Sequence, residues 1–257
     1  MSKNKLRKFA EMETFDNVFQ CSAADSDMTM PYHLAGKWRH EVFGNDNPLT
    51  LELGCGRGEY TVGLAQMFPQ KNCIGIDIKG ARMWAGAKQA ILSGTRNAAF
   101  LRTNIEFITR FFSADEIEEI WITFPDPQMK KATKRLTSSY FMQRYQKIMR
   151  DRGLIHLKTD SPFLYKYTLE MTKANGYELL KSTDNLYKTE TNNPILNLKT
   201  HYEQQWLDRG MSIKYLCFRL HHKQEFTEPE VDIEKDTYRS YGRNYNVSSQ
   251  KQQMTTK

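Results

Sequence analysis

The chain has 257 residues, with 37 Lys and Arg against 30 Asp and Glu, so its formal net charge is +7. Its four cysteines (Cys21, Cys55, Cys73 and Cys217) form no C-x-x-C pair, which excludes a disulfide framework and a cysteine-based zinc ribbon. No stretch approaches the roughly 18 apolar residues of a membrane span, and the first residues lack the apolar core of a secretory signal. We therefore expect a cytoplasmic protein with no metal site and no membrane partner.

The two ends of the chain differ in composition from its centre. Residues 1–30 are polar, with four basic side chains among the first eight positions. Because such a segment has little with which to build a core, we expect a flexible basic arm. A single domain would then span residues 31–241, and residues 242–257 would form a polar tail.

Between these ends, short apolar runs alternate with helical patterns. Strands are predicted at 49–53, 73–78, 98–101, 117–124, 154–158, 177–180 and 213–220, and helices at 59–68, 81–92, 105–111, 138–150 and 161–174. This alternation with short connections is typical of a parallel sheet with helices on both faces. The sequence therefore predicts an α/β fold with a doubly wound, mostly parallel, seven-stranded sheet.

A glycine-rich turn with Gly54, Gly56 and Gly58 follows the first predicted strand. In a doubly wound sheet this turn lies where the strand order reverses and ligands bind, and glycine lets the backbone approach a ligand closely. Glu59 stands where a dinucleotide fingerprint needs its third glycine, and a carboxylate there disfavours a pyrophosphate. With Glu52 beside it, the turn favours a ligand with a cationic or neutral head, such as S-adenosylmethionine. A turn that only packs a helix on a strand is the alternative.

Two further polar residues follow the next two strands. Asp77 ends the second strand, where a carboxylate can accept hydrogen bonds from both ribose hydroxyls of a nucleoside ligand. Asn104 follows the third strand, where the adenine of that ligand would lie. Either residue could instead cap the helix that follows it.

The fourth strand ends at a turn, residues 123–127, whose prolines fix the direction of Asp126. From Asp126 to Asp160 there are nine basic and three acidic side chains. Because one-sided charge on a segment is the electrostatic footprint of nucleic-acid binding, we expect a polyanion partner. Ordinary solvated surface is the alternative. The predicted RNA contacts are Lys131, Lys134 and Arg135.

Four blocks of the sequence together are similar to one known family. They are LELGCGRGEY, GIDIKG, TFPDPQMKKATKRL and THYEQQWLDRG, within residues 49–220. With these blocks the chain resembles the tRNA (guanine-N7)-methyltransferases. The resemblance implies a Rossmann-like class I methyltransferase fold whose final strand is antiparallel. It also implies methyl transfer from S-adenosylmethionine to N7 of a guanosine in the tRNA variable loop.

The resemblance also implies roles for individual residues. The implied cofactor contacts are Glu52, Asp77, Asn104 and Asp126, with Asp126 also assigned to catalysis. The implied substrate contacts are Lys130, Asp160, Thr200, His201, Tyr202 and Glu203. Two departures from the family pattern stand out: the family usually has Asp where this chain has Asn104, and its basic run after the Pro-Asp-Pro turn is usually denser.

The chemistry of guanine limits what Asp126 has to do. Guanine N7 carries a lone pair and no proton, so no base is needed before attack, and catalysis should be mainly alignment. A carboxylate near the base would stabilise the cationic product. We therefore expect Asp126 to orient the guanine rather than to act as an obligatory general base.

Two other functions remain open from the sequence. Methyltransferases that act on amino groups of adenine or guanine usually carry Asp or Asn, two prolines and an aromatic residue at the fourth strand. Here Gln128 follows Asp126 and Pro127, and the aromatic residue is missing. A non-catalytic RNA-binding protein on the same scaffold is disfavoured by the intact glycine turn. Monomer and homodimer are both compatible with the sequence.

Overall fold

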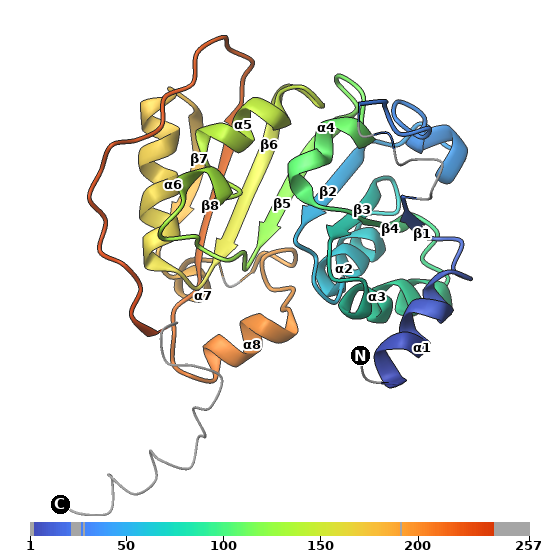
Figure 1. Cartoon of the computed structure of the whole chain (residues 1–257). Coiled ribbons are helices and arrows are strands. Elements are labelled where there is room, and N and C mark those ends of the chain that lie inside the picture. The colour runs from blue at the N-terminus through green and yellow to red at the C-terminus, as the bar shows by residue number, and fades with distance from the viewer. Residues whose placement is uncertain (1–2, 22–26, 28, 191, 239–257) are drawn as a thin grey trace, which may run out of the picture.

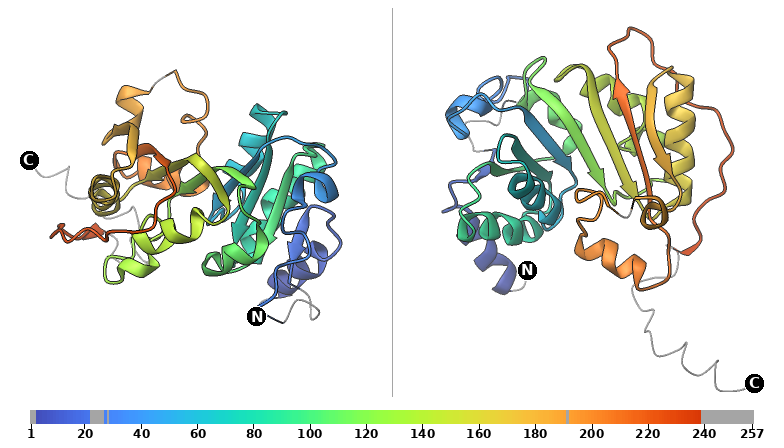
Figure 2. Two further views of the ribbon diagram at one scale, coloured as in Figure 1. Left: turned by 90° about the horizontal axis from the view of Figure 1, so that it is seen from above. Right: turned by 180° about the vertical axis from the view of Figure 1, so that it is seen from behind.

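A computed structural model describes residues 3–21, 27, 29–190 and 192–238. They form an eight-stranded sheet in the order β1-β4-β3-β2-β5-β6-β8-β7, with helices on both sides (Figures 1 and 2). The strand β8 pairs antiparallel with β6 and β7, and the other neighbouring pairs are parallel. The strands are β1 (Val18–Gln20), β2 (Leu49–Leu53), β3 (Asn72–Asp77), β4 (Ala98–Arg102), β5 (Ile117–Thr123), β6 (Met149–Thr159), β7 (Glu178–Thr183) and β8 (Lys214–Leu220).

The helices connect these strands and cover the two faces of the sheet. They are α1 (Lys3–Met12), α2 (Glu59–Met67), α3 (Gly80–Leu92), α4 (Ile108–Phe111), α5 (Ser139–Tyr145), α6 (Pro162–Ala174), α7 (Leu186–Thr189) and α8 (His201–Leu207). A π-helical turn lies at Trp38–Val42, and 3₁₀ turns lie at Ile105–Phe107 and Ala132–Lys134.

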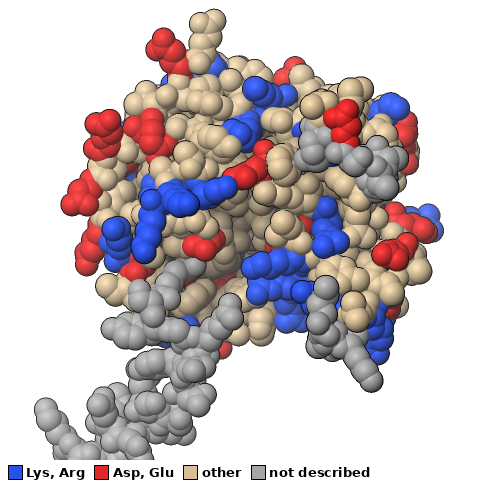
Figure 3. All heavy atoms as spheres, in the orientation of Figure 1, with Lys and Arg blue, Asp and Glu red and all other residues tan. Residues whose placement is uncertain are grey.

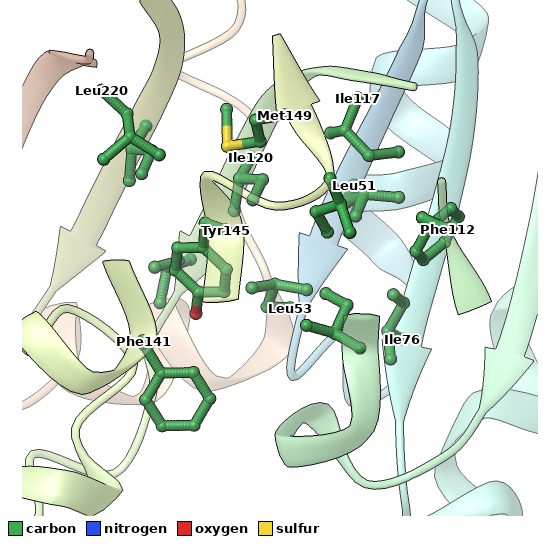
Figure 4. Close-up of a cluster of buried hydrophobic side chains, with 14 of the residues drawn as sticks. Leu51, Leu53, Ile76, Phe112, Ile117, Ile120, Phe141, Tyr145, Met149 and Leu220 are labelled. Carbon is green, nitrogen blue, oxygen red and sulfur yellow. The ribbon is translucent and has the colours of Figure 1, made fainter. Parts of the chain in front are cut away.

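One face of the sheet carries the larger core. Leu51 and Leu53 of β2 pack there with side chains of α4, α5 and α6, among them Phe111 and Tyr145, and all four are fully buried. Figure 4 shows this cluster between the strands and α5. Buried apolar runs of this kind are expected for central strands that are covered on both faces.

The other face packs against α2 and α3. Phe100 of β4 and Trp121 of β5 lie there with Tyr60 of α2 and Met83 of α3. Both helices start beside the glycine turn, so this core also fixes the position of the turn.

The N-terminal segment differs from the predicted arm. Met12 of α1 is 1% exposed, and Glu11 accepts a hydrogen bond from Trp84 Nε1 at 2.9 Å and pairs with Lys88 of α3. The strand β1 then adds an eighth strand beside β4, so the prediction of seven strands was wrong. Three residues are too few to show the period of a strand in a sequence.

Two other boundaries differ from the prediction. The helix expected to reach residue 150 ends at Tyr145, and β6 already begins at Met149, which pairs with Ile117 of β5. The helix predicted at 105–111 is a 3₁₀ turn followed by the short α4. The predicted tail, residues 242–257, lies outside the described residues.

Candidate active site

The candidate site lies at the carboxyl ends of the parallel strands. From β2 the chain moves outward to β3 and β4 and then returns to β5 on the other side of β2, so the strand order reverses between β2 and β5. Ligands of doubly wound sheets bind at such a switch point. The turns after β2 and β5 and the helix α8 lie at this edge of the sheet (Figure 1).

The three positions of the glycine turn require glycine for different physical reasons. All have positive φ: 76° at Gly54, 55° at Gly56 and 72° at Gly58. A Cβ on Gly58 would lie 2.5 Å from the Phe100 ring, so Gly58 serves helix packing. A Cβ on Gly54 would meet nothing within 4 Å, and one on Gly56 would meet its nearest neighbours only at 3.9 Å. The backbone at Gly54 and Gly56 therefore has the open space that a ligand requires.

Glu52, predicted to contact the cofactor, lies behind the turn. Its side chain is 2% exposed, and it accepts hydrogen bonds from Thr61 N at 2.8 Å and from the Thr61 and Thr123 hydroxyls at 2.5 and 2.6 Å. Burial raises the pKa of Glu52 to about 7, although the hydrogen bonds from Thr123 and Thr61 oppose the shift. Glu52 thus ties β2, α2 and β5 together beneath the site.

Asp77 lies at the end of β3 and Asn104 shortly after the end of β4, as predicted from the sequence. The Asp77 carboxylate accepts hydrogen bonds from Gly56 N at 2.9 Å and Lys79 N at 2.8 Å, which joins the end of β3 to the glycine turn. Asn104 Oδ1 accepts from Glu106 N at 3.1 Å and caps the 3₁₀ turn. The capping alternative is therefore realised for Asn104, and Asp77 is half-buried at the rim of the site.

The turn that carries Asp126 is held in an unusual backbone conformation. Phe124 and Gln128 on either side of it have φ of 50° and 49°, which is costly for residues other than glycine. Phe124 N donates to Lys158 O of β6 at 2.8 Å, and Asp126 Oδ1 accepts from Gln128 N at 3.2 Å. Asp126 itself is exposed at the end of β5, on the same edge of the sheet as the glycine turn (Figure 1).

Arg135, one of the predicted RNA contacts, supports this turn, and its burial disfavours a surface contact with RNA. It is 9% exposed and donates to the carbonyls of Gln128 and Met129, each at 3.2 Å. Its guanidinium lies 4.3 Å from the centre of the Tyr167 ring and 4.8 Å from that of Phe163. Stacking of this kind is a common way to bury arginine.

The other basic residues between Asp126 and Asp160 are scattered over the molecule. Lys130 and Lys131 are exposed, and Lys134 pairs with Glu106. Arg150 and Arg152 lie near the opposite end of β6 and pair with Glu118 and Glu178. The charge excess of residues 126–160 is therefore not one surface, and only its first part adjoins the site.

The fourth sequence block, residues 200–210, contains α8 and closes one side of the site. Thr200 and Glu203 form a capping box at the start of the helix. His201 N donates to Glu59 Oε2 of α2 at 3.1 Å, and the Tyr202 ring lies over the Arg82 guanidinium at 5.4 Å. These contacts bring α8 next to the glycine turn.

Two of the predicted substrate contacts are fully buried. Glu203 pairs with Lys158 at 2.9 Å, and both side chains have zero exposure. Asp160 is also fully buried, and its Oδ2 accepts from the Tyr238 hydroxyl at 2.5 Å. The sequence offered no signal for the contact of Tyr238 or for the burial of Lys158.

Some kinds of site are missing from the described part of the chain. No group of three or more His, Cys, Asp or Glu within the described ranges could hold a metal ion. Among the same residues, no helix has the length and apolar character needed to cross a bilayer.

The switch point, the glycine turn and the acidic residues at the strand ends, together with the matches below, place the protein in the class of doubly wound methyltransferases. Among solved structures, the 16S rRNA methyltransferase KamB superposes with a TM-score of 0.56 at 12% identity, covering 71% of this chain and 92% of that one. This likeness concerns the fold alone. A family model described as "Putative methyltransferase" matches residues 46–216.

Relatives in bacteria narrow the class further. A Bacteroides thetaiotaomicron protein named tRNA (guanine-N(7)-)-methyltransferase is 57% identical, covering 95% of this chain and 96% of its own. A Porphyromonas gingivalis protein of the same name is 55% identical over 90% of this chain and 96% of its own. The chain belongs to the tRNA (guanine-N(7)-)-methyltransferase family, as its sequence blocks predicted.

Proposed function

We propose that this protein transfers the methyl group of S-adenosylmethionine to N7 of a guanosine in the variable loop of tRNA. One observation supports the proposal beyond family membership: the glycine turn, the Asp126 turn and α8 lie at the same edge of the sheet, at the switch point between β2 and β5 (Figure 1). The hydrogen bond from His201 N to Glu59 Oε2 at 3.1 Å links α8 directly to α2, the helix that begins at the glycine turn.

The residues at the turn fit the cofactor. The backbone at Gly54 and Gly56 is open, and the half-buried Asp77 carboxylate stands at the end of β3, where a ribose would lie. When bound, S-adenosylmethionine supplies an electrophilic methyl group on a sulfonium. Asp77 would hold the ribose, while Glu52 would fix the turn from behind.

Methyl transfer requires the protein to align the two reactants and to stabilise the positive charge that develops on the purine. As the guanine N7 lone pair bonds to the methyl carbon, the carbon–sulfur bond breaks, and positive charge passes from sulfur to the purine. No proton has to leave N7. Asp126 is exposed on a stiff turn beside the crevice, so its carboxylate can face the guanine and stabilise this developing charge.

Exposed basic side chains suit the polyanionic substrate. Lys and Arg gather near the middle of the face seen in Figure 3. Lys130 and Lys131 follow the Asp126 turn, and Arg57 and Arg82 stand beside the glycine turn and α8. Cations on both sides of a crevice would attract the phosphates that flank the target nucleotide.

Nucleoside analysis of tRNA tests the proposal. The protein is incubated with tRNA and S-adenosylmethionine carrying a labelled methyl group, and the tRNA is then digested to nucleosides. We expect label in 7-methylguanosine, and we expect its loss when variable-loop guanosines are replaced by adenosine. Label in N2-methylguanosine or N6-methyladenosine would instead establish an amino-group methyltransferase. Cofactor binding without any transfer would favour a non-catalytic RNA-binding protein.

A further inference from the structure

The chain after β8 does not end at the sheet. Residues 221–238, here called the C-terminal strap, leave β8 and pass along α6 toward the edge of the sheet that carries the site (Figure 1). Glu228 of the strap accepts a hydrogen bond from Ser139 Oγ at 2.7 Å and another from the Tyr167 hydroxyl. These bonds attach the middle of the strap to α5 and α6.

The strap is attached a second time beside the site. Asp236 is 8% exposed, and its carboxylate accepts from Phe163 N at 3.0 Å and from the Ser161 hydroxyl at the start of α6. Asp236 N also lies 3.2 Å from the sulfur of Met129, three residues after Asp126. A buried carboxylate with these partners is a firm anchor.

Two residues further on, Tyr238 lies across Asp160. Its hydroxyl donates to Asp160 Oδ2 at 2.5 Å, and its ring meets the Trp206 ring of α8 edge-on, with centroids 5.3 Å apart and planes at 82°. Asp160 has zero exposure, whereas Tyr238 and Trp206 are only half-buried. The Asp160 carboxylate therefore has no exposed surface of its own, whereas the two aromatic rings are partly accessible.

We propose that Tyr238 and Trp206 form an aromatic wall of the guanosine site. The inference rests on the proposed function. Proteins recognise unpaired bases of RNA by stacking them on aromatic rings and by hydrogen bonds to their edges. The wall joins three elements that carry predicted substrate residues or lie beside them: the end of β6, α8 and the strap against Met129.

Methyl transfer at varied tRNA concentration tests the wall. For Tyr238→Ala in the full chain, we expect kcat/KM for tRNA to fall about tenfold or more, as for loss of a base–aromatic stack. Cofactor affinity, measured by calorimetry, should stay within about twofold, because Tyr238 lies on the guanosine side of the crevice. Tyr238→Phe should recover most of the loss, since it keeps the ring. If the alanine variant does not fold, Tyr238→Leu removes the aromatic ring while keeping apolar bulk.

A strap variant provides the matched control. Glu228→Gln weakens the attachment to Ser139 and Tyr167 but leaves Tyr238 in place, so its kcat/KM should equal that of the wild type. An equal loss in Glu228→Gln and Tyr238→Ala would overturn the inference, because the effect would then be strap stability. An unchanged or increased kcat/KM in Tyr238→Ala would also overturn it. Failure of the wild type to form 7-methylguanosine would be a failure of the proposed function and would be seen before any variant is compared.

Discussion

Lys158 and Glu203 form an ion pair of 2.9 Å in which neither side chain is exposed to solvent. Lys158 Nζ also donates to the carbonyls of Leu196 and Leu198, each at 2.9 Å, and Glu203 accepts from the Tyr187 hydroxyl at 2.5 Å. Burial lowers the pKa of Lys158, and Glu203 opposes that shift. The pair fastens α8 and the loop before it to the end of β6.

Removing one partner of this pair should be strongly destabilising. In Lys158→Met the Glu203 carboxylate stays buried without its cation, which typically costs about 3–5 kcal/mol. Urea denaturation of the wild type and the variant measures the difference. Lys173→Met is the control, because Lys173 and Glu170 form an exposed pair on α6, and its loss should change stability by less than about 1 kcal/mol. A similar small change in both variants would contradict the structural role of Lys158.

A second buried pair links stability to pH. His156 Nε2 lies 3.1 Å from Glu119, and its ring stacks on Trp121 with centroids 3.9 Å apart. Burial by itself would lower the pKa of His156, but hydrogen bonds with Cys217 and Glu119 raise it to about 9. Burial by itself would raise the pKa of Glu119, but His156 and Lys71 lower it to about 2.

The sign of each shift fixes the pH window. Because the folded-state pKa of His156 is raised from 6.5 to about 9, its contribution is complete below pH 6.5 and is lost as the pH rises through 9. Because the pKa of Glu119 is lowered from 4.5 to about 2, its contribution is present above pH 4.5 and is lost as the pH falls through 2. The alkaline loss should be of the order of 1–3 kcal/mol.

Thermal midpoints across the alkaline window check this prediction. We expect the midpoint of the wild type to fall between about pH 6.5 and pH 9.5, and the fall to be much smaller in Glu119→Gln, which removes the charge that keeps His156 protonated. His40→Gln is the control, since His40 and Asp46 form an exposed pair at 3.4 Å. Parallel curves for the wild type and Glu119→Gln would assign the alkaline loss to other groups.

Asp126→Asn should keep the fold and lose most of the turnover. The substitution keeps the shape of the turn but removes the negative charge that we propose faces the purine, and removal of one such group typically costs about 10²–10³ in kcat. Single-turnover kinetics with saturating tRNA and cofactor measure the effect. An essential base in the pH–rate profile of the wild type that disappears in this variant would instead establish general-base catalysis.

Asp77→Asn should weaken cofactor binding more than tRNA binding. The carboxylate is the predicted ribose acceptor, and an amide with the same shape replaces one of its acceptor oxygens with a donor. We expect an increase of about tenfold in the dissociation constant of S-adenosylmethionine, in line with one lost charge-assisted hydrogen bond. Calorimetry with the cofactor and filter binding with tRNA separate the two. An unchanged cofactor affinity would refute the ribose assignment.

Substitutions of Lys130 and of Arg135 should affect tRNA binding differently, although both residues lie in the basic segment after Asp126. Lys130→Ala with Lys131→Ala should weaken tRNA binding and flatten its salt dependence by about one to two units of slope. Lys166→Ala with Lys173→Ala on α6 is the matched double control and should leave the slope unchanged. A slope that does not change in the first pair would place the RNA footprint elsewhere.

Arg135→Lys should instead lower turnover and stability while preserving the salt slope. Lysine keeps the charge but cannot make both bonds to the carbonyls of Gln128 and Met129 while stacking on Tyr167. The Asp126 turn then loses its support. Denaturation and single-turnover rates measure the two effects, and a reduced salt slope in this variant would mean that Arg135 contacts phosphate after all.

The sequence revealed the strands and the turns at their ends because these signals are local. A run such as residues 49–53 followed by spaced glycines can be recognised without knowing what lies next to it. Burial of charge depends on partners far along the chain. Arg135 stacks on Tyr167, and Lys158 meets Glu203, 45 residues away. A charged residue looks the same in a sequence whether it faces water or a buried partner, so the burial of these two side chains could not be predicted.

The position of β8 has a consequence for synthesis of the protein on the ribosome. Among the described residues this strand is the last to be made, yet it lies between β6 and β7 and forms the ladders to both. Until residue 220 has left the exit tunnel, the inner edges of β6 and β7 stay unpaired, and α8 has no closed sheet beside it. Nascent or prematurely terminated chains therefore expose two strand edges, which are templates for aggregation. The sheet is complete only after β8 has been inserted between β6 and β7.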